Sequence, residues 1–223
     1  MRKFMLLFLM MLVASCVQAP WKTQTAFTCE QIAWLQRQVN TVTPIKTLRD
    51  SIHEEFDLPL ERIEARSDEN DPAIHYVTWT DQRKLTYRAT LDAKGQISSI
   101  GVDAANTPGD QLLSCLGQPS HYYAYARWEE NGPWHRAYLF FPAQGVMAHG
   151  SDHWRADNAT QPIPAIDGQF PFNELMIVKP QPIEQILTAG WGDYGPRRIL
   201  QECKPWPGAW EKIEFAYKSS LEQ

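Results

Sequence analysis

Three side chains that commonly bind metal ions stand close together in the stretch AHGSDHW: His149, Asp152 and His153. Two imidazoles and one carboxylate form a competent ligand set for a divalent metal ion, and would suit a metal-dependent envelope hydrolase. Gly150 and Ser151 disfavour a helix, so the spacing of four residues does not by itself bring the two imidazoles together. The HExxH pattern is absent from the sequence. We therefore predict solvated loop residues here, and we expect no metal ion or other cofactor.

Cys115 could act as a nucleophile if His121 or His135 lay beside it as the base. However, Cys115 falls on the apolar side of a predicted short helix, and a packed thiol there is inert. The sequence contains no GxSxG or SxxK motif for a serine nucleophile. Carboxylates such as those of Glu54 and Glu55 lie on an amphipathic segment, which is typical of a solvated face. We therefore predict that the protein is not an enzyme.

The chain contains nine Trp residues, and some of these rings could contact a ligand. Trp154, Trp206 and Trp210 lie in segments rich in Pro and Gly, where the backbone gives no strong reason for burial. We predict these three as ligand-contact aromatics. Exposed Trp and Tyr rings would suit a wall- or glycan-binding module, which is one alternative function. The aromatics of the hairpin around Tyr123 and Tyr125 are expected to pack against other elements, with an exposed aromatic shelf as the alternative.

The first sixteen residues have the pattern of a secretion signal. Two basic residues precede an apolar run that is too short to span a bilayer as a helix. The stretch VASC, ending at Cys16, resembles a bacterial lipobox, in which the cysteine thiol takes a diacylglyceryl group and cleavage falls before it. The alternative is an ordinary signal cut near Ala19. We predict a signal peptide over residues 1–15 and a lipid anchor on Cys16, because a Cys directly after an apolar run and small residues is uncommon by chance. Several acyl chains would then give lasting membrane attachment.

The net charge of the chain is −5, and it becomes −7 after cleavage before Cys16, which removes Arg2 and Lys3 but no acidic residue. An acidic protein has no electrostatic attraction to nucleic acid. We expect contact with a membrane through acylated Cys16, and partners among the proteins of the cell envelope. Because Val17 is not Asp, we expect the outer membrane as the location wherever the host has one.

Three cysteines remain after Cys16: Cys29, Cys115 and Cys203. An exported chain can keep a disulfide, and three thiols allow one bridge and leave one over. The spacing does not choose the pair, and the alternative is that all three are small buried apolar residues.

Hydrophobic spacing predicts a helix followed by a meander, twice. Thr28 is expected to cap a helix that begins near Cys29. Thr43-Pro44 and Thr107-Pro108 each offer a capping hydroxyl followed by Pro at the first helical position. Strands are expected over residues 74–80, 84–91 and 96–102, and again in HYYAYARWE, WHRAYLFF and VMAHG. We therefore predict an α+β fold of two tandem α-β-β-β units, residues 43–103 and 104–150; the alternative is helix-meander segments without duplication.

The predicted organisation has four parts: a signal peptide (1–15), a tether (16–27), an N-terminal α+β unit (28–103) and a C-terminal α+β unit (104–223). Residues 150–171 are polar and broken by Pro and Gly, as in a long loop. After this loop we expect a strand over 175–178, a helix over 182–189, and a last strand through Ile213, Phe215 and Tyr217.

The segment LGQPSHYYAYARWEENGPWHRAYLFF resembles the small outer-membrane assembly lipoproteins of the BamE (SmpA/OmlA) type, as well as uncharacterised bacterial lipoproteins of the same helix-meander plan. Leu116, Gly117, Pro119 and Trp128 are the matching positions, and the resemblance covers residues 107–148. This chain departs from the family by its larger size and its upstream copy. The resemblance implies a non-enzymatic lipoprotein that binds partners in the envelope. We therefore expect a lipid-anchored, non-catalytic binding or scaffolding component.

Overall fold

The computed structural model of the chain describes residues 26–39, 41–103, 106–129, 132–153, 165–191 and 196–218. The helices are α2 (Cys29–Val39), α3 (Ile45–Phe56), α4 (Gly109–Leu116), α5 (Ile183–Trp191) and α6 (Pro196–Glu202), with 3-10 turns η1 (Leu60–Arg62), η2 (Pro142–Gln144) and η3 (Trp210–Lys212). The strands are β1 (Glu64–Ser67), β2 (His75–Thr80), β3 (Thr86–Leu91), β4 (Ile97–Asp103), β5 (Thr107–Pro108), β6 (His121–Glu129), β7 (Gly132–Phe141), β8 (Val146–His153), β9 (Pro171–Phe172), β10 (Glu174–Val178), β11 (Lys204–Pro205) and β12 (Ala216–Lys218). None of these described helices has the length and apolar composition to cross a membrane.

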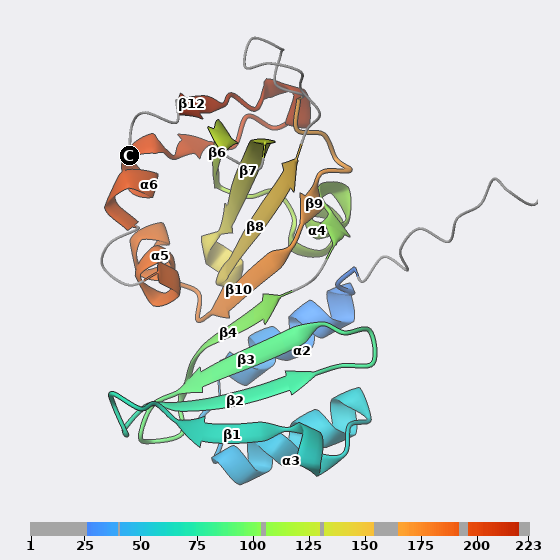
Figure 1. Cartoon of the computed structure of the whole chain (residues 1–223), viewed down its shortest axis with the longest axis vertical. Coiled ribbons are helices and arrows are strands. Elements are labelled where there is room, and N and C mark those ends of the chain that lie inside the picture. Colours follow the sequence, from blue (N-terminus) through green and yellow to red (C-terminus); the bar gives the residue numbers. More distant parts are fainter. Residues whose placement is uncertain are drawn as a thin grey trace, which may run out of the picture.

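One large sheet joins the two halves of the chain (Figure 1). Nine strands follow one another in the order β1-β2-β3-β4-β10-β8-β7-β6-β11, and β12 pairs with β6 in parallel. Both meanders lie where the sequence predicts them, but the prediction of two separate α-β-β-β units is wrong. The reason is β10, which pairs with β4 on one side and with β8 on the other and so closes the gap between the meanders.

Helices α2, α3 and α4 cover one face of this sheet, and α2 and α3 lie behind β1–β4 in Figure 1. The alternating side chains of β3 and β4 that point to this face are fully buried, among them Tyr87, Ile100 and Val102. They pack in the same core as Leu35 of α2 and Leu48 of α3. Burial of each such side chain contributes about 1.5–3 kcal/mol, so this layer supplies most of the apolar stabilisation of the N-terminal half.

The opposite face of the sheet is covered only in part. Helix α5 supplies Ile186 and Leu187 to a second core with Tyr138, Phe140 and Met147 of β7 and β8. Partly buried side chains of α6 pack at its edge. Over β1 to β3 no helix covers the same face among the described residues, and all four residues of β1 are exposed. The molecule therefore has a covered half and an open half on this face, and they meet where β4 adjoins β10.

The start of α2 follows the prediction. Thr28 Oγ1 accepts a hydrogen bond from Gln31 N, and Gln31 Oε1 accepts one from Thr28 N, which is a capping box. The two Thr-Pro starts are wrong in detail, because Pro44 and Pro108 are themselves the N-caps and no side chain caps either helix. The Thr107 hydroxyl accepts a hydrogen bond from Phe27 N instead. The Thr107 hydroxyl is therefore used in a contact between distant parts of the chain, and not as the cap of the helix that follows it.

A disulfide joins Cys29 at the start of α2 to Cys115 in α4, 86 residues later, and Cys203 is free. This outcome matches one of the two alternatives left open by the sequence. The bridge fastens the first helix to the second half of the chain.

Two further predictions of elements need correction. The predicted loop over residues 150–171 is wrong at both ends, since β8 continues to His153 and β9 occupies Pro171–Phe172. Residues 154–164 lie outside the described part of the chain. The predicted last strand is confirmed only over Ala216–Lys218, and Ile213 follows a 3-10 turn instead.

Candidate functional site

The three metal-ligand candidates do not converge. They lie in β8, where alternate residues point to opposite faces, so His149 and His153 share one face and Asp152 points to the other. A strand also separates two residues four positions apart by roughly 13 Å. Asp152 instead lies 3.8 Å from His135, and His153 packs on Trp134. Within the described ranges, no three His, Cys, Asp or Glu side chains are grouped so that they could hold a metal ion.

His149 has a different role from the one considered. Its Nδ1 donates a hydrogen bond to Glu174 Oε2 at 3.1 Å, and its ring stacks on Tyr138 with centroids 4.4 Å apart. The bond lowers the pKa of the Glu174 carboxyl. Burial raises the pKa of Tyr138, so its hydroxyl stays protonated. His149 is therefore held between a carboxylate and an aromatic ring.

The candidate nucleophile is not available as a thiol, because Cys115 is in the disulfide. His121 Nδ1 lies 3.0 Å from the hydroxyl of Ser120. His135 is buried between the rings of Phe170 and Phe215. The three residues thus have separate surroundings.

The aromatic candidates are distributed as follows. Trp154 lies outside the described residues. Trp206 and Trp210 are half-buried against the main core, with ring centroids 5.1 Å apart, and Trp210 Nε1 donates to Asp110 Oδ1 at 2.7 Å. Ligand contact by these rings stays a prediction. Tyr123 and Tyr125 are buried, which confirms packing for the hairpin aromatics.

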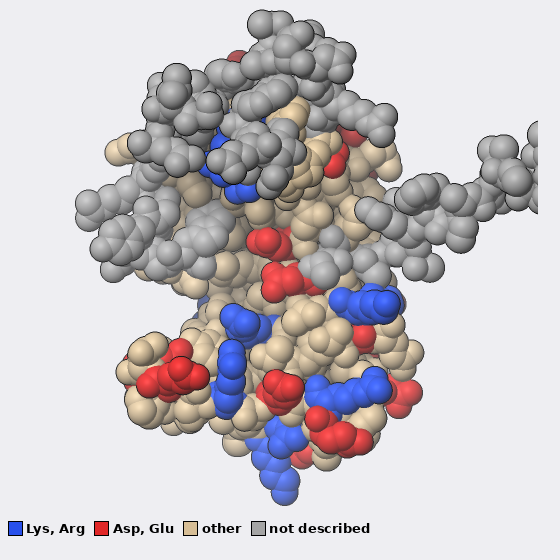
Figure 2. All heavy atoms as spheres, in the orientation of Figure 1, with Lys and Arg blue, Asp and Glu red and all other residues tan. Residues whose placement is uncertain are grey.

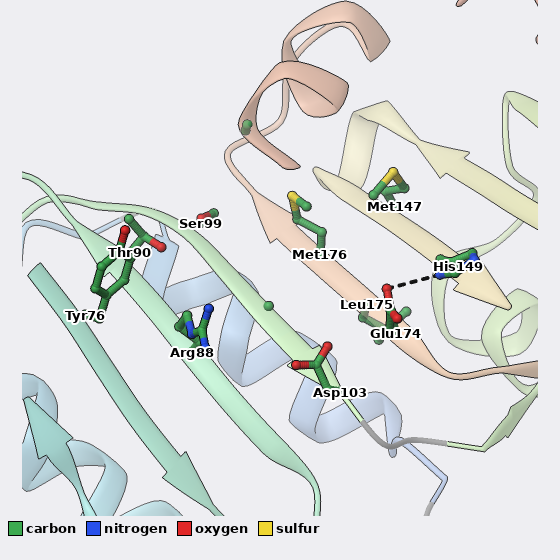
Figure 3. A pocket seen from close by; sticks show the side chains of 12 residues that line it. Tyr76, Arg88, Thr90, Ser99, Asp103, Met147, His149, Glu174, Leu175 and Met176 are labelled. Atoms are coloured by element: carbon green, nitrogen blue, oxygen red, sulfur yellow. Dashed lines mark hydrogen bonds and ion pairs between the residues drawn. The ribbon is translucent and has the colours of Figure 1, made fainter. Parts of the chain in front are cut away.

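A groove of about 290 Å³ lies on the open face of the sheet, at the junction of β4 and β10 (Figure 3). The residues at the centre of the groove lie directly opposite one another on neighbouring strands and form a row across the sheet. Arg88 of β3 is opposite Gly101 of β4, Gly101 is opposite Met176 of β10, and Met176 is opposite Met147 of β8. Gly101 has no side chain, so the row has a gap in its middle, with a guanidinium on one side and two thioethers on the other.

The next row towards one end of the groove is charged. Glu174 is opposite His149, and the pairing of Leu175 with Val102 places Glu174 opposite Asp103 one position further along. Burial, and then the negative charge of Glu174, raise the pKa of the Asp103 carboxyl, while Arg88 lowers it. Like charges directly opposite each other on neighbouring strands are destabilising. This end of the groove therefore favours a positively charged group.

Hydroxyl groups line the other end of the groove. Tyr76, Thr90 and Ser99 come from β2, β3 and β4. Figure 3 shows them away from Asp103 and Glu174, while Met147 and Met176 form the wall next to α5. Figure 2 shows acidic atoms over the junction of β4 and β10, with basic atoms beside them over the β1–β4 half. The groove thus offers groups of both charges, hydroxyls and an apolar wall.

Gly101 has no structural reason to be glycine. Its φ lies outside the left-handed region, and a Cβ built on it would meet no atom within 4 Å. Glycine inside a strand weakens the strand, and often marks a place where a ligand or another backbone approaches closely. The missing side chain therefore points to an occupant of the space above it.

Sequence reasoning found only His149 among the residues of the groove. Its other residues come from strands that are neighbours only because β10 inserts between β4 and β8, which no local pattern indicates. The one signal in the sequence is Gly101 itself, a glycine inside a predicted strand between two apolar β-branched residues.

No family model, no curated protein and no solved structure matches this chain. The resemblance to lipoproteins of the BamE (SmpA/OmlA) type therefore stays a prediction.

Proposed function

We propose that the protein is a lipid-anchored component of the cell envelope that binds a ligand or partner in the groove over Gly101, without catalysis. The observation that carries the proposal is the gap at Gly101, a weakening residue in mid-strand that no backbone or packing constraint requires. Around this gap lie unlike chemical groups from five strands, β2, β3, β4, β8 and β10. Such convergence of a few polar groups beside an apolar wall is typical of a binding site.

The lipobox at Cys16 supports the anchored location. The folded body includes the last two residues of the predicted tether, Ala26 and Phe27, so the predicted boundary at residue 27 is too late. Arg83 Nη1 donates to Ala26 O at 3.2 Å, Gln111 Nε2 donates to Phe27 O at 2.6 Å, and the Phe27 side chain is fully buried. A tether from Cys16 would thus join the body at a fixed point. In a host with an outer membrane, we propose that membrane as the location.

A binding role without catalysis suits the state of the ionisable groups. His149 donates to Glu174 and stacks on Tyr138, so its position is fixed by two partners. The side chains of Arg88 and Asp103 make no hydrogen bond or ion pair within the described ranges, although Arg88 is close enough to lower the pKa of Asp103. The charged side chains of Arg88 and Asp103 are therefore suited to forming ion pairs with charged groups of a ligand.

Acid–base chemistry in the same groove is a second candidate function. The pKa of Asp103 is raised and that of the opposed Glu174 is lowered, which is the arrangement of a general acid beside an ionised carboxylate. A hydrolase of this kind would lose its activity in the Asp103→Asn variant. A binding protein would show no turnover in either form.

Two measurements test the proposed function. The first is the mass of the mature N-terminal peptide, residues 16–22, from the native host. We expect diacylglyceryl and acyl groups on Cys16, and membrane release of the Cys16→Ser variant; an unmodified peptide that begins near Pro20 would contradict the anchor. The second is photo-cross-linking from position 176, with position 80 on β2 as the control. We expect an adduct with a defined envelope component from position 176 alone, and equal adducts from both positions would contradict the groove as binding site.

A further inference from the structure

We propose that the groove over Gly101 binds an α-amino acid zwitterion, or a dipeptide whose two termini carry the same pair of charges, and this inference rests on the proposed function. Its ammonium group would lie by Asp103 and Glu174, its carboxylate by Arg88, and its side chain against Met147 and Met176. The volume of about 290 Å³ is near the lower end of the range of small-molecule sites, which suits a ligand of this size.

The carboxylate end of the groove requires a cation. Asp103 and Glu174 occupy opposed positions of β4 and β10 and carry the same charge. Glu174 has a donor in His149, but the side-chain carboxylate of Asp103 has no hydrogen-bond or ion-pair partner among the described residues. An ammonium group has three donors, so it can donate to both carboxylates at once and offset one of their two negative charges.

Arg88 is the side chain that would bind the anionic group of the ligand. Its guanidinium lies over the ring of Tyr76, with 6.0 Å from Cζ to the ring centroid, and forms no ion pair within the described part of the chain. Arg88 is one strand and two positions away from Asp103. A guanidinium fork binds a carboxylate with two parallel hydrogen bonds, so a ligand with adjacent positive and negative groups complements the pair.

The ligand's apolar part is assigned by the wall of the groove. Met176 is half-buried and Met147 is buried, and they are paired across β10 and β8. Methionine side chains are flexible and polarisable, so they adapt to apolar groups of different shape. The gap at Gly101 lies between this wall and Arg88 and leaves room for the ligand backbone.

Calorimetric titration of the mature chain tests this inference with four probes: L-leucine, L-leucyl-L-leucine, N-acetyl-L-leucine without the ammonium, and L-leucinamide without the carboxylate. We expect L-leucine or the dipeptide to bind, and both blocked probes to bind about tenfold more weakly or not at all. Tighter binding of L-leucine identifies a free amino acid as the ligand, and tighter binding of L-leucyl-L-leucine identifies a dipeptide. Equal binding of a blocked probe would overturn the proposal.

Two variants assign the ends of the ligand. Arg88→Gln should remove the preference for L-leucine over L-leucinamide, and Asp103→Asn should remove the preference over N-acetyl-L-leucine. Preferences that survive both substitutions would overturn the assignment. If no probe binds while position 176 still gives a specific cross-link, the ligand class is wrong and the proposed function stands. If the cross-link also fails, both are wrong.

Discussion

Arg88 and Gly101 are paired across β3 and β4, and the side chain that glycine lacks leaves the guanidinium beside an open groove. On the other side of Gly101 lies Met176, so the gap separates a charged group from an apolar one. Because neighbouring strands are about 4.8 Å apart, the two flanking backbones are roughly 10 Å from each other. The missing side chain at position 101 therefore creates the space in which a ligand could contact both Arg88 and Met176.

The two opposed carboxylates should give stability a characteristic pH dependence. The pKa of Glu174 is lowered by His149, so its contribution is complete above its unfolded value, near 4.5, and is lost as the pH falls through the folded pKa. Glu174→Gln should therefore destabilise the protein at neutral pH, by about 0.2–1 kcal/mol for this half-exposed pair. The difference should vanish in acid, and urea unfolding across pH measures it. A difference that persists in acid would contradict the ionic origin.

Asp103 should behave in the opposite sense. Its pKa is raised by burial and by Glu174, so the folded state binds the proton more tightly than the unfolded state does. This group therefore lowers stability at neutral pH, and the loss is recovered as the pH falls through the raised pKa. Asp103→Asn should be at least as stable as the wild type at neutral pH, in the same urea experiment. A clear destabilisation would show that the carboxylate has a structural partner.

The disulfide between Cys29 and Cys115 should be the main covalent source of stability. Replacing both cysteines by serine should lower the free energy of unfolding by about 2–4 kcal/mol, because the bridge closes a long loop of the unfolded chain. Cys203→Ser is the matched control and should keep the sensitivity of the wild type to reductant. Equal unfolding midpoints for wild type and double variant would contradict this role.

The thiol of Cys203 should be unreactive in the folded protein. Burial, and then the charges of Glu184 and Glu202, raise its pKa to about 12 from a usual value of 9.0. Its thiolate population at neutral pH is then on the order of a thousandfold below that of an ordinary cysteine. Alkylation by iodoacetamide, followed by mass spectrometry, should be slow until urea unfolds the chain. Alkylation at the rate of free cysteine would contradict the buried position.

The hydroxyl of Thr107 should contribute to stability although it caps no helix. It accepts a hydrogen bond of 2.9 Å from the backbone of Phe27, and both residues are fully buried. Thr107→Val keeps the shape but leaves that N–H without an acceptor, which should cost about 1–3 kcal/mol. Thr80→Val, at an exposed position of β2, is the control. Equal effects in urea unfolding would contradict the special position of Thr107.

Local pattern was sufficient for most helices and for both meanders, because their periods are properties of neighbouring residues. The cap at Thr28 could be placed for the same reason, and the structure adds Gln31 as its reciprocal partner. The order of strands could not, since Leu175–Val178 has no feature that selects β4 and β8 as its partners. The error of two separate units follows from that single strand.

The site was less predictable than the fold. His149 was found as a candidate ligand, but its partner Glu174 is 25 residues away and was not considered. Asp103 and Arg88 look like ordinary surface charges in the sequence, and only the sheet places them around one gap. The choice among three cysteines needed the distance between α2 and α4, which spacing along the chain does not contain.

The most direct test of the groove is the Gly101→Val substitution, measured by cross-linking from position 176 in the native host. Valine favours a strand, and its Cβ would meet no atom within 4 Å. We therefore expect the free energy of unfolding, measured in urea, to be unchanged or higher by about 0.5–1 kcal/mol. We expect the cross-linked adduct to be lost nevertheless, because the valine side chain fills the space that the ligand would occupy. An undiminished adduct in this stable variant would contradict the groove as the binding site.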